Sequence, residues 1–82
     1  MAEVTYYVAL PFAQSEEGVV PREAVECTSA HAAVARAEVF SRKEGIAGAV
    51  AFCRSGDPAT GEFGDAILLR RFGDVPNDLS AL

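Results

Sequence analysis

The residues best suited to chemistry stand in the stretch RSGDPATGEFGDA, residues 54–66, which holds three glycines, one proline and three carboxylates. Asp57, Glu62 and Asp65 suggest a calcium site, because Ca²⁺ prefers oxygen ligands. A calcium loop of the EF-hand type needs such ligands at alternate positions and a later glutamate, and this spacing is absent. Asp-Pro and Thr-Gly favour a turn instead. We expect this stretch to connect two strands without binding a metal.

A second group of candidates lies near the start of an expected helix. Thr28 or Ser29 can cap this helix, and His31 falls in its first turn. The free amides and the dipole of a helix start attract anions. Together with Tyr6 and Tyr7, these residues are candidates for a small-ligand or anion site. The alternative interpretation is a capped helix start that happens to carry a surface histidine.

Few residues in this chain are suited to catalysis. His31 is the one histidine, and Cys27 and Cys53 are the two cysteines. No acid stands at a spacing typical of a nucleophile triad, and no signature links a cysteine to the histidine. Two cysteines are too few for a disulfide framework or a thiolate zinc site, so we expect reduced thiols. The sequence therefore predicts no catalytic residue, no metal and no cofactor.

Length and charge narrow the class of protein further. The chain of 82 residues is 50% apolar and 23% charged, which is typical of one small globular domain. Its net charge of −5 argues against nucleic acid as a partner, because binding to phosphates needs clustered Lys and Arg. The longest apolar run, residues 45–53, is far shorter than the ~20 residues that span a bilayer. With no secretory signal either, we expect a cytoplasmic protein without membrane contact.

Hydrophobic periodicity predicts one helix and several strands. Apolar residues at helical spacing predict a helix over about residues 29–44, supported by Glu38 four residues before Arg42. Alternation and apolar content predict strands, and Gly and Pro predict a turn at residues 14–21. In the last strand we expect Phe63, Ile67 and Leu69 to face inward. The expected strands cover residues 4–12, 22–27, 46–54 and 62–72.

The order of these elements predicts an α+β fold of the ββαββ type. A right-handed crossover through the helix leaves a gap between the second and third strands, which the first strand can fill. We therefore expect a four-stranded antiparallel sheet in the order 2-1-3-4, with the helix packed on one face. The domain should cover residues 1–75, and residues 76–82 should form a frayed tail.

A single helix leaves one sheet face uncovered. On the expected register this open face carries small residues and one tyrosine, and such apolar patches mark interfaces. We expect this face, or the outer helix stripe of Ala32, Ala35 and Val39, to form a homodimer. The alternative is that alanine-rich strands tolerate water. The expected interface residues are Tyr7, Ala9, Ala47, Ala49 and Ala51.

Basic residues are expected to gather at one end of the molecule. In the expected topology the end of the fourth strand, with Arg70 and Arg71, approaches the end of the helix, with Arg42 and Lys43. Such an end can bind an acidic segment of a partner protein, although solvated charge is the simpler interpretation.

The phrases GDPATGE and FGDVP, together with VTYYVALPF at the start, resemble a set of small uncharacterised bacterial proteins of similar length. The resemblance covers most of the chain and implies a bacterial, cytoplasmic setting, but it brings no reaction, ligand or catalytic residue with it. The sequence thus favours a non-enzymatic module for protein interaction or homodimerisation. A small-ligand or anion-binding module is the alternative.

Overall fold

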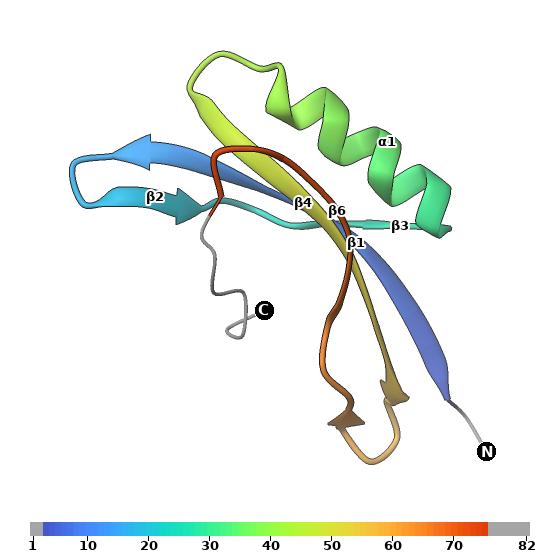
Figure 1. The fold of residues 1–82 in the computed structure, drawn as a ribbon. Coiled ribbons are helices and arrows are strands. Elements are labelled where there is room, and N and C mark those ends of the chain that lie inside the picture. The colour runs from blue at the N-terminus through green and yellow to red at the C-terminus, as the bar shows by residue number, and fades with distance from the viewer. Residues whose placement is uncertain (1–2, 76–82) are drawn as a thin grey trace.

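The computed structural model describes residues 3–75, so the expected tail at residues 76–82 lies outside the described residues. The fold is α+β, with one helix packed on a curled antiparallel sheet (Figure 1). None of the helices in the described range is long and apolar enough to cross a membrane. The elements in chain order are β1 (Val4–Ser15), β2 (Gly18–Pro21), β3 (Val25–Cys27), α1 (Ala30–Ser41), β4 (Ile46–Asp57), β5 (Glu62–Phe63) and β6 (Ile67–Gly73).

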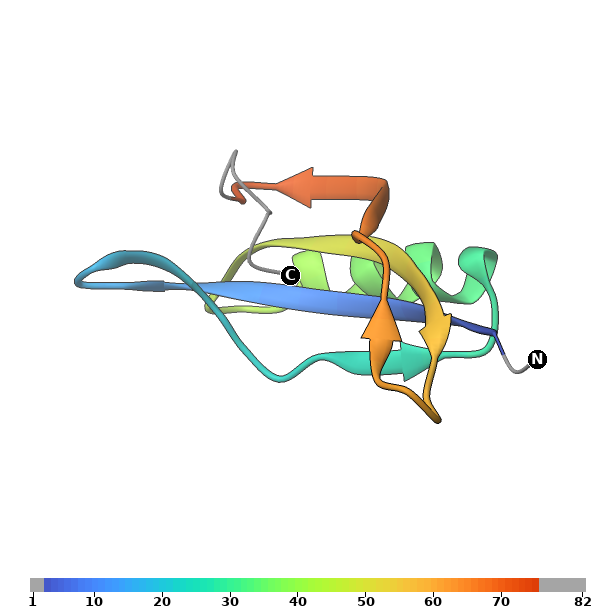
Figure 2. The same cartoon turned by 90° about the horizontal axis from the view of Figure 1, so that it is seen from below.

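The main strands follow the predicted order. β1 pairs with β3 on one side and with β4 on the other, and β4 pairs in turn with β6, all antiparallel. The order β3-β1-β4-β6 is the expected 2-1-3-4 arrangement, which is therefore confirmed. Figure 2 shows β3 and β6 at opposite margins of the sheet, with β1 and β4 between them and α1 behind.

The prediction that residues 14–21 form only a turn is wrong. Gly18–Pro21 is the strand β2, which pairs with residues 12–15 of β1. The turn itself is limited to Glu16 and Glu17, and Gly18 follows it with φ of 108°, which a residue with a side chain rarely adopts. Sequence analysis missed β2 because the turn residues Gly18 and Pro21 make up half of its four residues. The expected strand at 22–27 shrinks to β3, and the one at 62–72 divides into β5 and β6.

The helix begins as expected and ends early. The Ser29 hydroxyl accepts a hydrogen bond from the Ala32 amide at 3.1 Å, so Ser29 is the N-cap. The helix ends at Ser41, three residues before the expected end. Arg42 pairs with Glu38 at 2.7 Å, which confirms the predicted spacing on the helix surface.

The helix covers the sheet face that was expected to be open, so the predicted face assignment is wrong. Ala9, Ala49 and Ala51 are fully buried, and they form one cluster with Ala33 and Ala37 of α1. Tyr7 packs against this cluster, and the half-buried Ala47 belongs to the same alternating row of β4. The physical reason is close approach, because small side chains on both surfaces let the helix lie near the sheet. These alanines therefore form part of the core.

The opposite face carries the larger apolar side chains, which form a second core. Leu10, Phe12, Val50 and Phe52 are buried there, and Val75 packs on them from beyond the end of β6. We refer to this as the helix-distal face. The curl of the sheet helps to enclose it without a second helix, so both faces of β1 and β4 are buried at mid-length (Figure 1).

Candidate functional site

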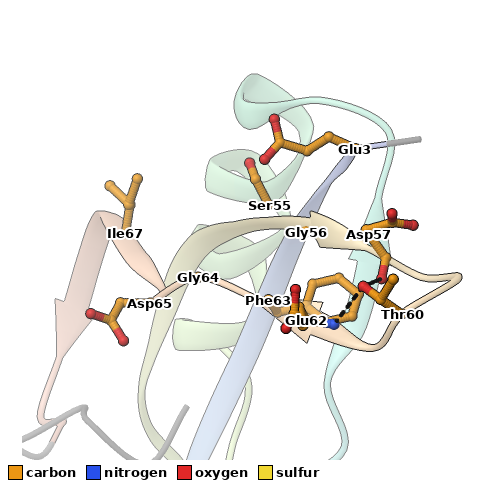
Figure 3. Close-up of a pocket in the computed structure, with 10 residues that line it drawn as sticks. All are labelled: Glu3, Ser55, Gly56, Asp57, Thr60, Glu62, Phe63, Gly64, Asp65 and Ile67. Carbon is orange, nitrogen blue, oxygen red and sulfur yellow. Dashed lines mark hydrogen bonds between the residues drawn. The ribbon is translucent and has the colours of Figure 1, made fainter. Parts of the chain in front are cut away.

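An open groove of about 880 Å³ lies at the β4–β5 hairpin, in the stretch that the sequence marks most strongly. Its walls come from β4, β5, the start of β6 and Glu3 before β1. Figure 3 shows Asp57, Thr60 and Glu62 gathered at the hairpin, with Asp65 and Ile67 at the other end of the groove. We call this feature the hairpin groove.

The hairpin forms because Asp57 organises its own turn. The Asp57 carboxylate accepts a hydrogen bond from the Ala59 amide at 2.9 Å, and the Asp57 carbonyl accepts one from the Gly61 amide at 2.8 Å. The Thr60 hydroxyl also donates to that carbonyl, at 3.3 Å. Such side-chain bonds to the following backbone are the reason that Asp favours turns. The prediction of a turn between two strands is confirmed.

The charge of the hairpin groove decides what it can attract. Glu3, Asp57, Glu62 and Asp65 line it, and among residues 3–75 no basic residue does. Over residues 3–75, no group of three or more His, Cys, Asp or Glu side chains is arranged to hold a metal ion. A groove lined by charges of one sign attracts the opposite sign, so basic side chains of a partner are favoured here and anions are repelled.

An apolar pocket of about 350 Å³ adjoins the hairpin groove on the helix-distal face, and Phe63 lines both. Tyr6, Val8 and Phe52 form the pocket together with Ala24 and Arg54. The rings of Tyr6 and Phe63 lie 5.7 Å apart with 49° between their planes, a favourable tilted arrangement. This contact links β5 to β1 across the helix-distal face.

Exposed apolar side chains concentrate around the same end of β4. Of the five large ones that are exposed among residues 3–75, four flank positions 52–56 of β4. Val4 and Phe63 lie on either side of Gly56, and Leu68 lies opposite Phe52, so these three share the helix-distal face. The exposed apolar cluster consists of Val4, Phe63, Ile67 and Leu68.

Sequence reasoning misplaced two members of this cluster. Phe63 and Ile67 were expected to face inward, but they are 41% and 63% exposed. The reason is that the expected fourth strand is interrupted between β5 and β6, and a bulge follows at Leu69, where β6 has one more residue than β4. Leu69 does pack against the helix-side core, as expected. The run of apolar residues at 67–69 was the one available sign of a register problem.

The residues of the predicted ligand site do not share one surface. Ser29 uses its hydroxyl to cap α1, while Thr28 and His31 are exposed beside it. Tyr7 packs on the helix side of the sheet, whereas Tyr6 lines the apolar pocket on the other side. Of the five candidates, Tyr6 alone contributes to a pocket described above.

The basic residues predicted to form one end are partly engaged within the chain. Arg42 pairs with Glu38, and the Lys43 ammonium lies 5.6 Å from the centre of the Phe40 ring. The Arg70 guanidinium lies 5.4 Å from the centre of the Phe72 ring. Arg71 is exposed on β6, opposite Val50, and it too makes an interaction within the chain. A basic surface that binds an acidic partner segment stays a prediction.

The two cysteines lie on strands that flank β1. Cys27 of β3 and Cys53 of β4 are both opposite Tyr7, one on each side, and both are free thiols. Two strand spacings of about 4.8 Å separate their Cα atoms by about 9.6 Å. A disulfide needs Cα atoms within about 7 Å, so this sheet geometry keeps the thiols apart.

With this geometry established, the chain was compared with known proteins. No family model, curated protein or solved structure matches it. The resemblance to small bacterial proteins therefore stays an expectation.

Proposed function

We propose that this domain works by association with another polypeptide, in the first place a second copy of itself, and not by catalysis. The observation that carries the proposal is the exposed apolar cluster, which gathers four large side chains at one end of the sheet. Single exposed apolar residues are ordinary, but adjacent ones on a small domain mark an interaction surface. The proposed interface of the homodimer is therefore this end of the sheet and not the alanine face that was expected from the sequence.

The position of the cluster also suits association. Phe63 lines both the apolar pocket and the hairpin groove, and Ile67 lines the groove, so apolar side chains of the cluster stand beside charged ones. Protein interfaces commonly have this arrangement, with a dry centre and a polar rim. Two-fold homodimers are the commonest oligomers, which favours a second copy as the partner.

The wild-type chain is expected to sediment as a dimer at ~100 μM, well above the dissociation constants of stable dimers. The variant Ile67→Glu should weaken dimerisation at least about tenfold, because it places a carboxylate at the most exposed member of the exposed apolar cluster. Val39→Glu is the matched control, since Val39 is 53% exposed on α1, away from the cluster. Sedimentation velocity over a concentration series measures both.

A monomeric wild type at ~100 μM would contradict the proposed homodimer. If Val39→Glu disrupted the dimer and Ile67→Glu did not, the outer stripe of the helix would be the interface instead.

The apolar pocket favours a second candidate function, the binding of a small apolar ligand. Its volume of about 350 Å³ lies near the lower end of the range of ligand sites, about 300–1,000 Å³. Its aromatic walls with one cationic side chain, Arg54, also fit the usual composition of such sites. This candidate corresponds to the ligand-binding alternative expected from the sequence, and Tyr6 is the one residue of that expected site that lines the pocket.

A thermal-shift assay against a panel of small aromatic compounds separates the two functions. The association module predicts an unchanged Tm throughout the panel. A ligand specific to the folded state at about 100 times its Kd would stabilise it by about 2.7 kcal/mol and raise the Tm visibly. A shift that Phe52→Ala abolishes would favour the ligand-binding function.

A further inference from the structure

Three of the four carboxylates in the hairpin groove belong to one row across the sheet. Asp57 of β4 lies opposite Glu62 of β5. On the other side of β4, Val4 lies opposite Gly56, and the antiparallel register therefore brings Glu3 beside Asp57. Neighbouring strands are about 4.8 Å apart, so the Cα atoms of this row span about 10 Å. We call Glu3, Asp57 and Glu62 the carboxylate row.

The negative charge of the carboxylate row is not balanced within the groove. Among residues 3–75, the side chains of Glu3, Glu62 and Asp65 take part in no ion pair. Like charges directly opposite each other in a sheet are destabilising, and Asp57 and Glu62 are such a pair. A cation held between them would remove this repulsion. It would meet no competing positive charge, because none of the described residues that line the groove is basic.

The other end of the groove presents the most exposed side chain of the exposed apolar cluster. Ile67 is 63% exposed, lines the groove and lies opposite Cys53 of β4. Cys53, Ser55 and Asp57 are alternate residues of one strand, so they share a face of the sheet. Four residues of a strand span about 13 Å. Ile67 and the carboxylate row are therefore about 13 Å apart, with Ser55 between them (Figure 3).

These two features fit an extended polypeptide that is basic. Alternate side chains of an extended segment point to one side, and residues four apart in it are separated by about 13 Å. An apolar residue on Ile67 then places the residue four positions away at the carboxylate row, where Lys or Arg forms charge-assisted hydrogen bonds. Asp65, at the same end of the groove as Ile67, can accept a second basic side chain.

We propose that the hairpin groove binds an extended basic segment of a different protein, with an apolar side chain on Ile67 and a Lys or Arg, four residues away, at the carboxylate row. Charge selects this occupant over a second copy of the chain, whose net charge is −5. The inference rests on the proposed function, because Phe63 and Ile67 of the exposed apolar cluster line the groove. It adds a partner of other chemistry, which competes with a second copy for Ile67.

NMR chemical-shift perturbation of the isotope-labelled full chain tests the binding. The probe is a threonine-rich peptide of nine residues, capped at both ends, with leucine at its third position and arginine at its seventh and ninth. Signals of residues 55–67 should shift, with a Kd of about 1 mM or lower. Replacing both arginines of the peptide by glutamate, or its leucine by serine, should weaken binding at least about tenfold. Salt at about 1 M should also weaken it, because the Debye length falls to about 3 Å.

The double variant E3Q/E62Q removes two charges of the carboxylate row and should bind the peptide at least about tenfold more weakly. Asp57 is left unchanged, because its carboxylate holds the turn. Glu17→Gln is the matched control, because Glu17 lies in the β1–β2 turn, at the opposite end of β1 from Glu3. It should bind the peptide as the wild type does. Circular dichroism verifies that each variant is folded.

Equal affinity of the arginine and glutamate peptides, or of the wild type and E3Q/E62Q, would overturn this inference. Sedimentation tests the homodimer separately, so a dimeric wild type that binds no peptide would overturn the groove proposal alone. If E3Q/E62Q then also lost dimerisation, the occupant of the groove would be a second copy. A monomeric wild type that binds the peptide would overturn the homodimer and support the groove proposal.

Discussion

Replacing Gly48 by alanine is expected to lower the free energy of unfolding by about 3 kcal/mol, as overpacked core positions do. A Cβ atom at Gly48 would lie 2.5 Å from the Phe72 carbonyl oxygen and 2.6 Å from the Asp74 amide nitrogen. Both are backbone atoms, so no rotation of a side chain relieves the contact. The end of β6 would have to move away from β4.

That movement would also weaken bonds which fix the end of the sheet. The Asp74 amide donates to the Ala47 carbonyl at 3.0 Å, and Val75 just beyond it packs in the helix-distal core. The predicted loss corresponds to a fall in Tm of about 12–24 °C for a domain of this size. For a small domain this is a large part of the total stability.

Thermal and urea denaturation followed by circular dichroism measure the effect. Gly64→Ala is the control, because a Cβ there meets its nearest neighbour, the Ser55 carbonyl oxygen, at an ordinary 3.7 Å. If the two variants melted together within a few degrees, the close approach of β6 to Gly48 would be wrong.

The arrangement of the main strands could be predicted because it follows from connectivity. A helix between the second and third strands fixes their direction, and the gap left between them suits the first strand. The extra strand β2 escaped prediction because Gly18 and Pro21, which favour turns, stand at both ends of its two valines. Short hairpin strands take their structure from the strand that they pair with, here β1.

The faces of the sheet could not be assigned from periodicity alone. Alternation separates Val8, Leu10 and Phe12 from Tyr7 and Ala9, but it does not say which row faces the helix. The prediction placed large residues under the helix, where most burial is expected. The structure instead matches the small residues of the sheet to Ala33 and Ala37 of α1, and the curl of the sheet encloses the large ones. Complementary size decided the packing.

The candidate site, like the fold, was predictable from the sequence only in part. The turn at Asp57 was predictable, because a local side-chain bond produces it. The exposure of Phe63 and Ile67 was not, because it depends on the break between β5 and β6 and on the bulge at Leu69. Both features are set by the pairing of β5 and β6 with β4. β4 is near both strands in the sequence, but no local sequence pattern specifies the register of this pairing.

The close contact between helix and sheet makes Ala37→Leu the second strongly destabilising substitution. Ala37 is fully buried, and the facing residues Ala9, Ala49 and Ala51 are fully buried as well, so three added carbon atoms find no space. The helix must then lift from the sheet or the side chain must take a strained rotamer. Overpacking of this kind costs about 1–3 kcal/mol, and we expect the upper end, a fall in Tm of about 12–24 °C.

Ala35→Leu is the control for this substitution, since Ala35 is exposed on the same helix and leucine is nearly as good a helix former as alanine. It should change the Tm by little, because surface substitutions usually stay within about 0.5 kcal/mol. Equal stability of both variants would mean that the alanine face is not packed tightly under α1. It would then be free to act as the interface that the sequence alone suggests. A large loss for Ala37→Leu, with dimerisation unchanged in the folded fraction, would instead separate the alanine core from the exposed apolar cluster.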